Sequence, residues 1–191
     1  MKVVIAIDSF KGSLSSFEAG RAAAEGIKLV YPSADVVISP LADGGEGTAR
    51  ALTFGLGGEM VSVTVTGPLG EPVVAEYGYL PKTKTAVLEM ASAAGITLVS
   101  PEKRNPLYTT TFGVGELILH AAREKGCREF IVGIGGSATN DGGTGMLSAL
   151  GVSFLDQSGA PIRTGAVGLS SLAKIDLSGL DRKSTRLNSS H

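Results

Sequence analysis

The 191-residue chain lacks tryptophan, and only 5% of its residues are aromatic, which disfavours stacking sites for sugars or single-stranded nucleic acid. Its one cysteine, Cys127, excludes an intrachain disulfide framework and fits a reducing cytosol. No apolar run approaches the ~18 residues of a membrane span. The formal net charge is −1, so the chain does not have the excess of basic residues that is typical of nucleic-acid-binding proteins. We therefore expect a cytoplasmic protein without nucleic-acid or membrane partners; its oligomeric state stays open.

Glycine and apolar residues are plentiful. The chain holds 27 glycines without a collagen-like period, 43% hydrophobic residues and 18% charged residues. This composition can bury a core and favours many tight loops, as in α/β proteins.

The first forty residues predict a strand, a helix and a second strand. "KVVIAID" and "ADVVISPLA" are short β-branched runs typical of buried parallel strands. Between them, Ser15 with Glu18 three residues later forms a capping box that opens a helix to about Tyr31. This pattern predicts a βαβ unit.

The next segment has a different periodicity. Residues 60–91 alternate apolar and polar side chains with turn signals between them, which predicts antiparallel strands. A helix is expected over 112–125, a buried strand in "CREFIVGIGG" and a hairpin in "VSFLDQSGAPI". The fold class is therefore α/β, with a parallel sheet flanked by helices and a second α/β subdomain containing antiparallel strands. The expected boundaries are 1–60 and 61–181.

The last ten residues differ in character. Residues 182–191 read "RKSTRLNSSH", with three basic residues, no acidic ones and a single apolar one. We expect a non-native tail on a truncated chain; an ordinary disordered terminus is the alternative.

Two loops follow the predicted parallel strands and carry charged side chains. "DSFKGS" places Asp8 and Lys11 before a helix N-terminus, which favours anions. "LADGGEGT" brackets Gly44 and Gly45 with Asp43 and Glu46, which could bind Mg²⁺ or accept a hydroxyl proton. Ordinary turns are the alternative for both.

A third loop, "IGGSATNDGGTGM", follows the third buried strand. Its consecutive glycines allow backbone N–H groups to approach an oxyanion, and its hydroxyl, amide and carboxylate side chains add ligands. The loop lacks the lysine of a P-loop. Gly133, Gly135 and Ala138 also fit G-x-G-x-x-A, an alternative that points to an NAD(P)-dependent oxidoreductase. Too few residues remain before "VSFL" for a full crossover helix, which weighs against it.

Taken together, "DSFKGSLSS", "LADGGEGT" and "GIGGSATNDGGTGM" resemble the glycerate kinase family, over residues 1–181. The resemblance implies ATP-dependent phosphorylation of D-glycerate to 2-phosphoglycerate, with ATP and Mg²⁺ as cofactors. It also implies two α/β domains, one of them flavodoxin-like, in a protein longer than this chain.

Site residues are assigned by placing phosphoryl-transfer chemistry on these motifs. The expected catalytic residues are Asp43, Lys11 and Asp8, with Asp43 and Asp141 as metal ligands. The expected cofactor-binding residues are Gly135, Gly136, Ser137, Thr139, Asn140, Asp141, Gly44 and Gly45. A noncatalytic small-anion-binding protein is the alternative.

The role of the segment before the 112–125 helix stays open, and one histidine is expected to have no functional role. Arg104, Asn105 and the threonines at 109–111 precede a helix, where they either bind the glycerate carboxylate or cap the helix. His120 lies on a polar helix face with Glu116 and Glu124 and is expected to be solvated.

Overall fold

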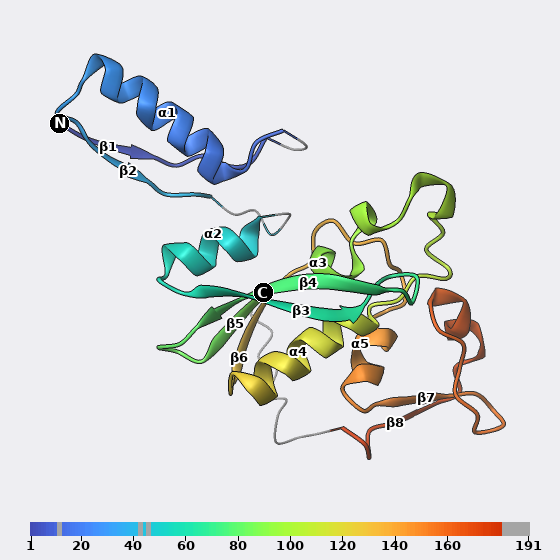
Figure 1. Ribbon diagram of the computed structural model, residues 1–191. Coiled ribbons are helices and arrows are strands. Elements are labelled where there is room, and N and C mark those ends of the chain that lie inside the picture. The colour runs from blue at the N-terminus through green and yellow to red at the C-terminus, as the bar shows by residue number, and fades with distance from the viewer. Residues whose placement is uncertain (11–12, 42–43, 45–46, 181–191) are drawn as a thin grey trace.

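The computed structural model describes residues 1–10, 13–41, 44 and 47–180. Lys11, Asp43 and Gly45 of the predicted site lie outside these residues, as does the predicted tail at 182–191. Figure 1 shows a small N-terminal unit in blue, a central sheet with its helices, and a short C-terminal strand pair.

The N-terminal unit is the predicted strand, helix and strand. β1 (Lys2–Ile5) pairs in parallel with β2 (Asp35–Ile38), and α1 (Ser16–Val30) connects them. The capping box is confirmed: Glu18 N–H donates to Ser15 Oγ at 3.2 Å, and Ser15 N–H donates to the Glu18 carboxylate at 2.8 Å. Because these bonds satisfy N–H groups that the first helical turn cannot, they fix where α1 begins.

The central sheet runs in the order β3-β4-β5-β6. β3 (Glu59–Thr66), β4 (Pro72–Leu80) and β5 (Thr85–Glu89) are antiparallel neighbours, which confirms the strands expected from alternation. β6 (Glu129–Gly133) joins parallel to β5 after a long crossover that includes α4 (Phe112–Glu124). The carboxyl ends of β5 and β6 therefore lie side by side.

Helices cover both faces of this sheet, which explains the burial of β5. Leu88 packs in a core with Leu117 and Ile118 of α4, whereas Val87 packs on the other face with Ala49 of α2 (Thr48–Gly55). Fully burying such an aliphatic side chain contributes about 1.5–3 kcal/mol. The apolar faces of two helices thus hold this sheet and position the loops at its carboxyl end.

Short elements complete the described chain: α3 (Met90–Ala94), η1 (Ile96–Leu98), η2 (Pro101–Lys103), α5 (Thr144–Ala149), β7 (Ser153–Leu155), η3 (Ala166–Ser171) and β8 (Lys174–Asp176). β7 pairs antiparallel with β8, and Leu155 also bridges Pro161 across the predicted hairpin turn. The α/β fold class is confirmed: β1 and β2 form a parallel pair, and the central sheet combines antiparallel strands with the parallel pair of β5 and β6. The domain boundaries at 60 and 181 stay predictions.

The region after β6 does not form a dinucleotide-binding unit. α5 has only six residues, and the following strand β7 pairs with β8 and not with β6. A dinucleotide fold would need a full crossover helix and a parallel partner strand here. The described geometry therefore weighs against the oxidoreductase alternative.

Candidate functional site

A cleft of about 470 Å³ lies where the loop after β1 approaches α2 and the end of β5. Its walls come from the β1–α1 connection, the start of α2 and the strands β3 to β5. Serines and two glutamates supply most of the polar groups: Ser9, Ser13, Ser15, Ser16, Ser92, Glu76 and Glu89, together with Arg50. This set can bind hydroxyl groups and cations.

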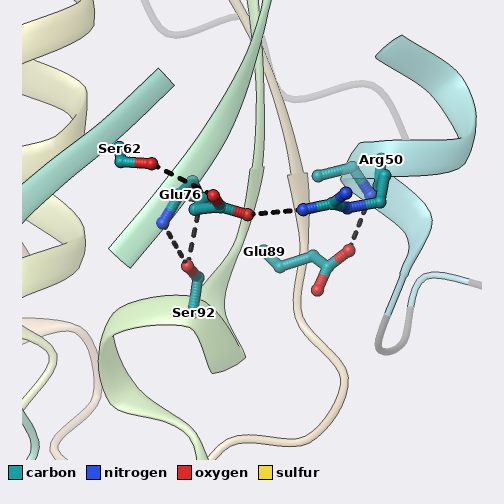
Figure 2. A network of polar contacts seen from close by, with 6 residues as sticks. Arg50, Ser62, Glu76, Glu89 and Ser92 are labelled. Atoms are coloured by element: carbon teal, nitrogen blue, oxygen red, sulfur yellow. Dashed lines mark hydrogen bonds and ion pairs between the residues drawn. The ribbon is translucent and has the colours of Figure 1, made fainter. Parts of the chain in front are cut away.

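Glu76 is the centre of a fixed polar network in this cleft (Figure 2). Its Oε2 forms an ion pair with Arg50 Nη2 at 2.9 Å, and Ser62 Oγ donates to its Oε1 at 3.0 Å. Ser92 Oγ holds the Glu76 backbone by accepting its N–H at 2.7 Å and donating to its carbonyl at 3.0 Å. Because the ion pair is half-exposed, it is worth only about 0–1 kcal/mol. Its role is to orient Arg50.

Glu89 ends β5 beside the N-terminus of α2. Its Oε1 accepts the Ala49 N–H at 2.6 Å, so a carboxylate lies at the positive end of that helix. The same residue lines the cleft and is paired in register with Gly133 of β6. Glu89 therefore connects the cleft to the glycine-rich loop that follows β6.

Described residues on either side of positions 11–12 in the first predicted loop line the cleft. Asp8 Oδ1 accepts the Ser9 N–H at 2.7 Å, and Phe10 N–H donates to the Leu14 carbonyl at 2.8 Å. Ser9 and Ser13 line the cleft, whereas Asp8 does not. Asp8 thus fixes the loop that carries Ser9, and its catalytic assignment stays a prediction.

The second and third predicted loops touch each other. Gly135 N–H donates to the Gly44 carbonyl at 3.1 Å, and Gly44 N–H donates to Thr48 Oγ1 at 3.1 Å. A Cβ at Gly133 would lie 2.9 Å from the Gly44 carbonyl oxygen, so only glycine allows this approach. Two loops separated by about ninety residues in sequence are thereby brought to one place.

The third loop is held by backbone pairing with the chain after α3. Ala138 N–H donates to the Ala94 carbonyl at 2.8 Å, and Ile96 N–H donates to the Gly136 carbonyl at 2.9 Å. Within the loop, Ser137 Oγ lies 2.7 Å from Thr139 Oγ1 and accepts the Thr139 N–H at 3.0 Å. Two predicted ligand side chains thus lie together on a fixed backbone, while Asn140 is exposed.

Asp141 is buried and surrounded by donors. Only 1% of the residue is exposed. Its carboxylate accepts the N–H groups of Thr111 at 2.9 Å, Gly143 at 3.0 Å and Gly145 at 3.1 Å, and the Thr111 hydroxyl. These contacts tie the loop to the starts of α4 and α5. They fit a positioning role better than metal coordination, which needs free carboxylate lone pairs.

The segment before α4 divides into two parts. Thr109, Thr110 and Thr111 are buried, and their hydroxyls bond to Ala138, Phe112 and Asp141, so these residues have a structural role. Arg104 and Asn105 instead line a second pocket with Ser137 and Thr139. The threonines therefore serve the local structure, whereas a ligand-binding role for Arg104 and Asn105 stays a prediction.

The expectation for His120 is wrong. His120 is half-buried, and its Nδ1 lies 3.0 Å from the Tyr77 hydroxyl. Glu116 on the same face accepts the Thr66 N–H at 2.6 Å. Burial raises the pKa of Tyr77 above its ordinary value, so the phenol stays neutral and able to donate. This face of α4 contacts β3 and β4, which a single-helix pattern does not show.

Sequence reasoning missed Arg50, Glu76 and Glu89. The signal for Glu76 is weak, because a glutamate at that position of an alternating strand also fits a solvated face. Glu89 follows the apolar run "TAVL", and its place at the end of a buried strand could have marked it. Arg50 is separated from Glu76 by 26 residues, so only the fold pairs them.

Two features are absent from the residues that the structure describes. No group of three or more His, Cys, Asp or Glu side chains is placed to hold a metal ion. No described helix is long and apolar enough to cross a membrane.

Comparison with known proteins identifies the class. The model of the glycerate kinase family matches residues 3–190. The chain belongs to this family. It is 55% identical to the glycerate kinase of Bacillus subtilis (strain 168) over 183 residues, which are 96% of this chain and 48% of that protein. It is 51% identical over 181 residues to the glycerate 2-kinase of Escherichia coli (strain K12), covering 95% of this chain and 47% of that protein.

A solved structure supports the fold. The crystal structure assigned as glycerate kinase 2 from Salmonella typhimurium LT2 superposes with a TM-score of 0.85 at 50% identity, over 96% of this chain and 49% of that one. This chain thus spans about half the length of the relatives that it matches.

Proposed function

We propose that this chain carries part of the active site of an ATP-dependent D-glycerate kinase that forms 2-phosphoglycerate in the cytoplasm. The observation that supports this most is the meeting of the Gly44 and Gly135 backbones beside Glu89 and the cleft. Family membership and the names of the relatives support glycerate as the substrate.

Phosphoryl transfer is mostly positioning and charge stabilisation. When bound, Mg·ATP supplies the phosphoryl group and the cation that offsets its charge. We assign Asp43 to accept the proton of the attacking glycerate hydroxyl, and Lys11 to neutralise phosphate or carboxylate. Ser9 and Ser13 in the cleft orient hydroxyl groups by hydrogen bonding.

The residues proposed to bind ATP phosphates and those proposed to bind Mg²⁺ differ in their chemistry. Gly135, Gly136, Ser137 and Thr139 offer N–H and O–H donors suited to phosphate oxygens. For Mg²⁺, the Asp43 carboxylate has the right oxygen chemistry. Asp141 is enclosed by donors, so we assign it to hold the loop and not to touch the metal.

The test is release of ADP that requires both Mg²⁺ and D-glycerate. It is made on this chain and on a fusion that adds the remaining half of the Bacillus subtilis relative. Asp43→Asn in the fusion should abolish turnover with an unchanged circular dichroism spectrum. Asp35→Asn, on exposed β2, is the charge-matched control and should keep full activity. Normal turnover by Asp43→Asn would refute its assignment.

The position of the phosphate is read from the product. Phosphorus on the C2 oxygen couples to one carbon-bound proton, whereas phosphorus on the C3 oxygen couples to two. A doublet in the proton-coupled ³¹P spectrum is expected, and a triplet would contradict 2-phosphoglycerate. Anion binding by a folded fusion without any ADP release would instead support the noncatalytic alternative.

A further inference from the structure

A second pocket, of about 210 Å³, lies between the chain after α3 and the loop after β6. Its lining residues are Ile96, Val99, Arg104, Asn105, Pro106, Thr109, Ser137, Ala138 and Thr139. None of them lines the larger cleft. The two pockets are therefore separate among the described residues.

The chemistry of this pocket is opposite to that of the cleft. The cleft is lined by two glutamates and one arginine, whereas the smaller pocket has an arginine, an amide and hydroxyls without any carboxylate. A pocket with a guanidinium and no acidic group attracts oxyanions and repels metal ions.

Its walls are fixed by bonds that leave donors available. Arg104 Nε donates to the Val99 carbonyl at 3.1 Å, which orients the guanidinium while its terminal N–H groups have no partner in the described chain. Asn105 Oδ1 accepts the Leu107 N–H at 3.1 Å, so the amide nitrogen is the part left to donate. Elsewhere in the lining, Thr109 Oγ1 donates to the Ala138 carbonyl at 2.8 Å and holds that backbone.

Part of the same lining belongs to the proposed phosphate loop. Ser137 and Thr139, whose hydroxyl oxygens are 2.7 Å apart, line this pocket and not the cleft. The predicted phosphate ligands thus share this pocket with Arg104, which the chain supplies from more than thirty residues earlier. A planar guanidinium in the same pocket as two hydroxyls suits a carboxylate or phosphoryl group, which a guanidinium binds by two parallel hydrogen bonds.

We propose that the Arg104–Asn105–Ser137–Thr139 pocket is a subsite for a small oxyanion. Its volume is below the ~300–1,000 Å³ of pockets that hold drug-sized ligands, so it takes one anionic group and not a whole nucleotide. The inference rests on the proposed function only for naming the two sources of that group, the carboxylate of D-glycerate and a phosphate of ATP.

Isothermal titration of the chain with D-glycerate, ATP and inorganic phosphate tests the subsite without requiring turnover. All lining residues belong to this chain, so the chain alone should bind. Arg104→Gln should weaken binding by roughly 10-fold or more, the usual effect of losing a charge-assisted hydrogen bond. Lys103→Gln removes the same charge one residue away, outside the pocket, and should bind as the parent does.

The anions distinguish the two sources. Weakening for D-glycerate alone assigns the subsite to the carboxylate, and weakening for ATP and inorganic phosphate assigns it to a phosphoryl group. Arg104→Lys keeps the charge but not the planar fork and should fall between the parent and Arg104→Gln. Ser137→Ala tests the hydroxyl side of the pocket's chemistry independently should Arg104→Gln fail to fold.

Two results would overturn the subsite: no binding of the three anions by the parent chain, or equal binding by folded Arg104→Gln and Lys103→Gln. Neither bears on the kinase proposal, which the fusion's ADP release tests. Conversely, Arg104-dependent anion binding with a catalytically silent fusion would leave the subsite standing and remove the kinase.

Discussion

The N-terminal β1–α1–β2 unit and the β3–β6 sheet use similar apolar strands but bury them very differently. No residue of β1 or β2 is fully buried, and Val4 is 60% exposed. In β5, Val87 and Leu88 are both completely buried. Figure 1 shows why: α1 covers only one face of its strand pair, whereas the central sheet has helices on both faces.

The burial of these strands depends more on whether helices cover both faces of the sheet than on how apolar the strand sequence is. "VVI" in β1 and "AVL" in β5 are equally apolar, and each belongs to a parallel pair. Parallel strands are stable when both faces are covered. The central sheet therefore carries its own core, and α1, which buries only Ser16, Ala19 and Gly20, contributes little to one.

The largest expected effect tests this contrast with one truncation in each region. Leu117→Ala, in the core under the central sheet, should lower the free energy of unfolding by about 2–5 kcal/mol, because it leaves a cavity. Leu29→Ala in α1, where the side chain is 86% exposed, should change it by less than about 0.5 kcal/mol. Urea unfolding followed by circular dichroism measures both. Equal losses would refute the contrast.

The second prediction concerns the polar part of the same region. Asp141→Asn replaces one acceptor oxygen by an amide donor facing backbone N–H groups, and should cost about 1–3 kcal/mol. Asp156→Asn is the matched control, since Asp156 also accepts backbone N–H groups but in an exposed turn, and its loss should be smaller. Urea midpoints compare them; a larger effect at Asp156 would contradict the positioning role.

The local elements of the fold could be predicted from sequence because their causes are local. Ser15 and Glu18 are three residues apart, and the alternation in β3 to β5 has a period of two. The strand pairing, by contrast, depends on contacts such as that between β5 and β6, which α4 separates in sequence. Periodicity alone does not identify such partners.

The candidate site likewise combines features that could be predicted from sequence with contacts that depend on the fold. The three loops were recognisable from their residue types. The fold alone brings Gly135 into contact with Gly44, and it places Arg104 and Ser137 in the lining of one pocket. Asp141 illustrates the limit most clearly. Its residue type and loop suggest a metal ligand, but they do not show that the starts of α4 and α5 supply donors to both of its oxygens.

A third prediction tests how α1 contacts its strands. A Cβ at Gly20 would lie 2.6 Å from Cγ2 of Ile38, so Gly20→Ala should push α1 from β2 and cost about 1–3 kcal/mol. Gly26→Ala, on the exposed side of the same helix with open space around it, should stabilise α1 by about 0.5–1 kcal/mol. Amide hydrogen exchange in α1 reports both. Equal protection in the two variants would show that α1 does not pack closely on β2.

The smallest expected effect is a pH dependence confined to the N-terminal unit. The Ser15 backbone N–H and hydroxyl donate to Glu18 and hold the pKa of its carboxyl below the ordinary value. Because the folded pKa is the lower one, this contribution is complete above the unfolded value. It is lost as the pH falls through the folded pKa.

Acidification should therefore increase amide exchange at the start of α1 before it affects β5, whose core has no such carboxylate cap. Ser15→Ala removes the hydroxyl but keeps the backbone N–H, so it should move the pKa of Glu18 only part of the way toward its ordinary value and weaken this early step, as measured by NMR titration of the Glu18 carboxyl. Thr83→Ala, outside α1, is the control and should leave the titration unchanged. If α1 and β5 lost protection together at every pH, the two regions would unfold as one unit, and the difference in burial would carry no difference in local stability.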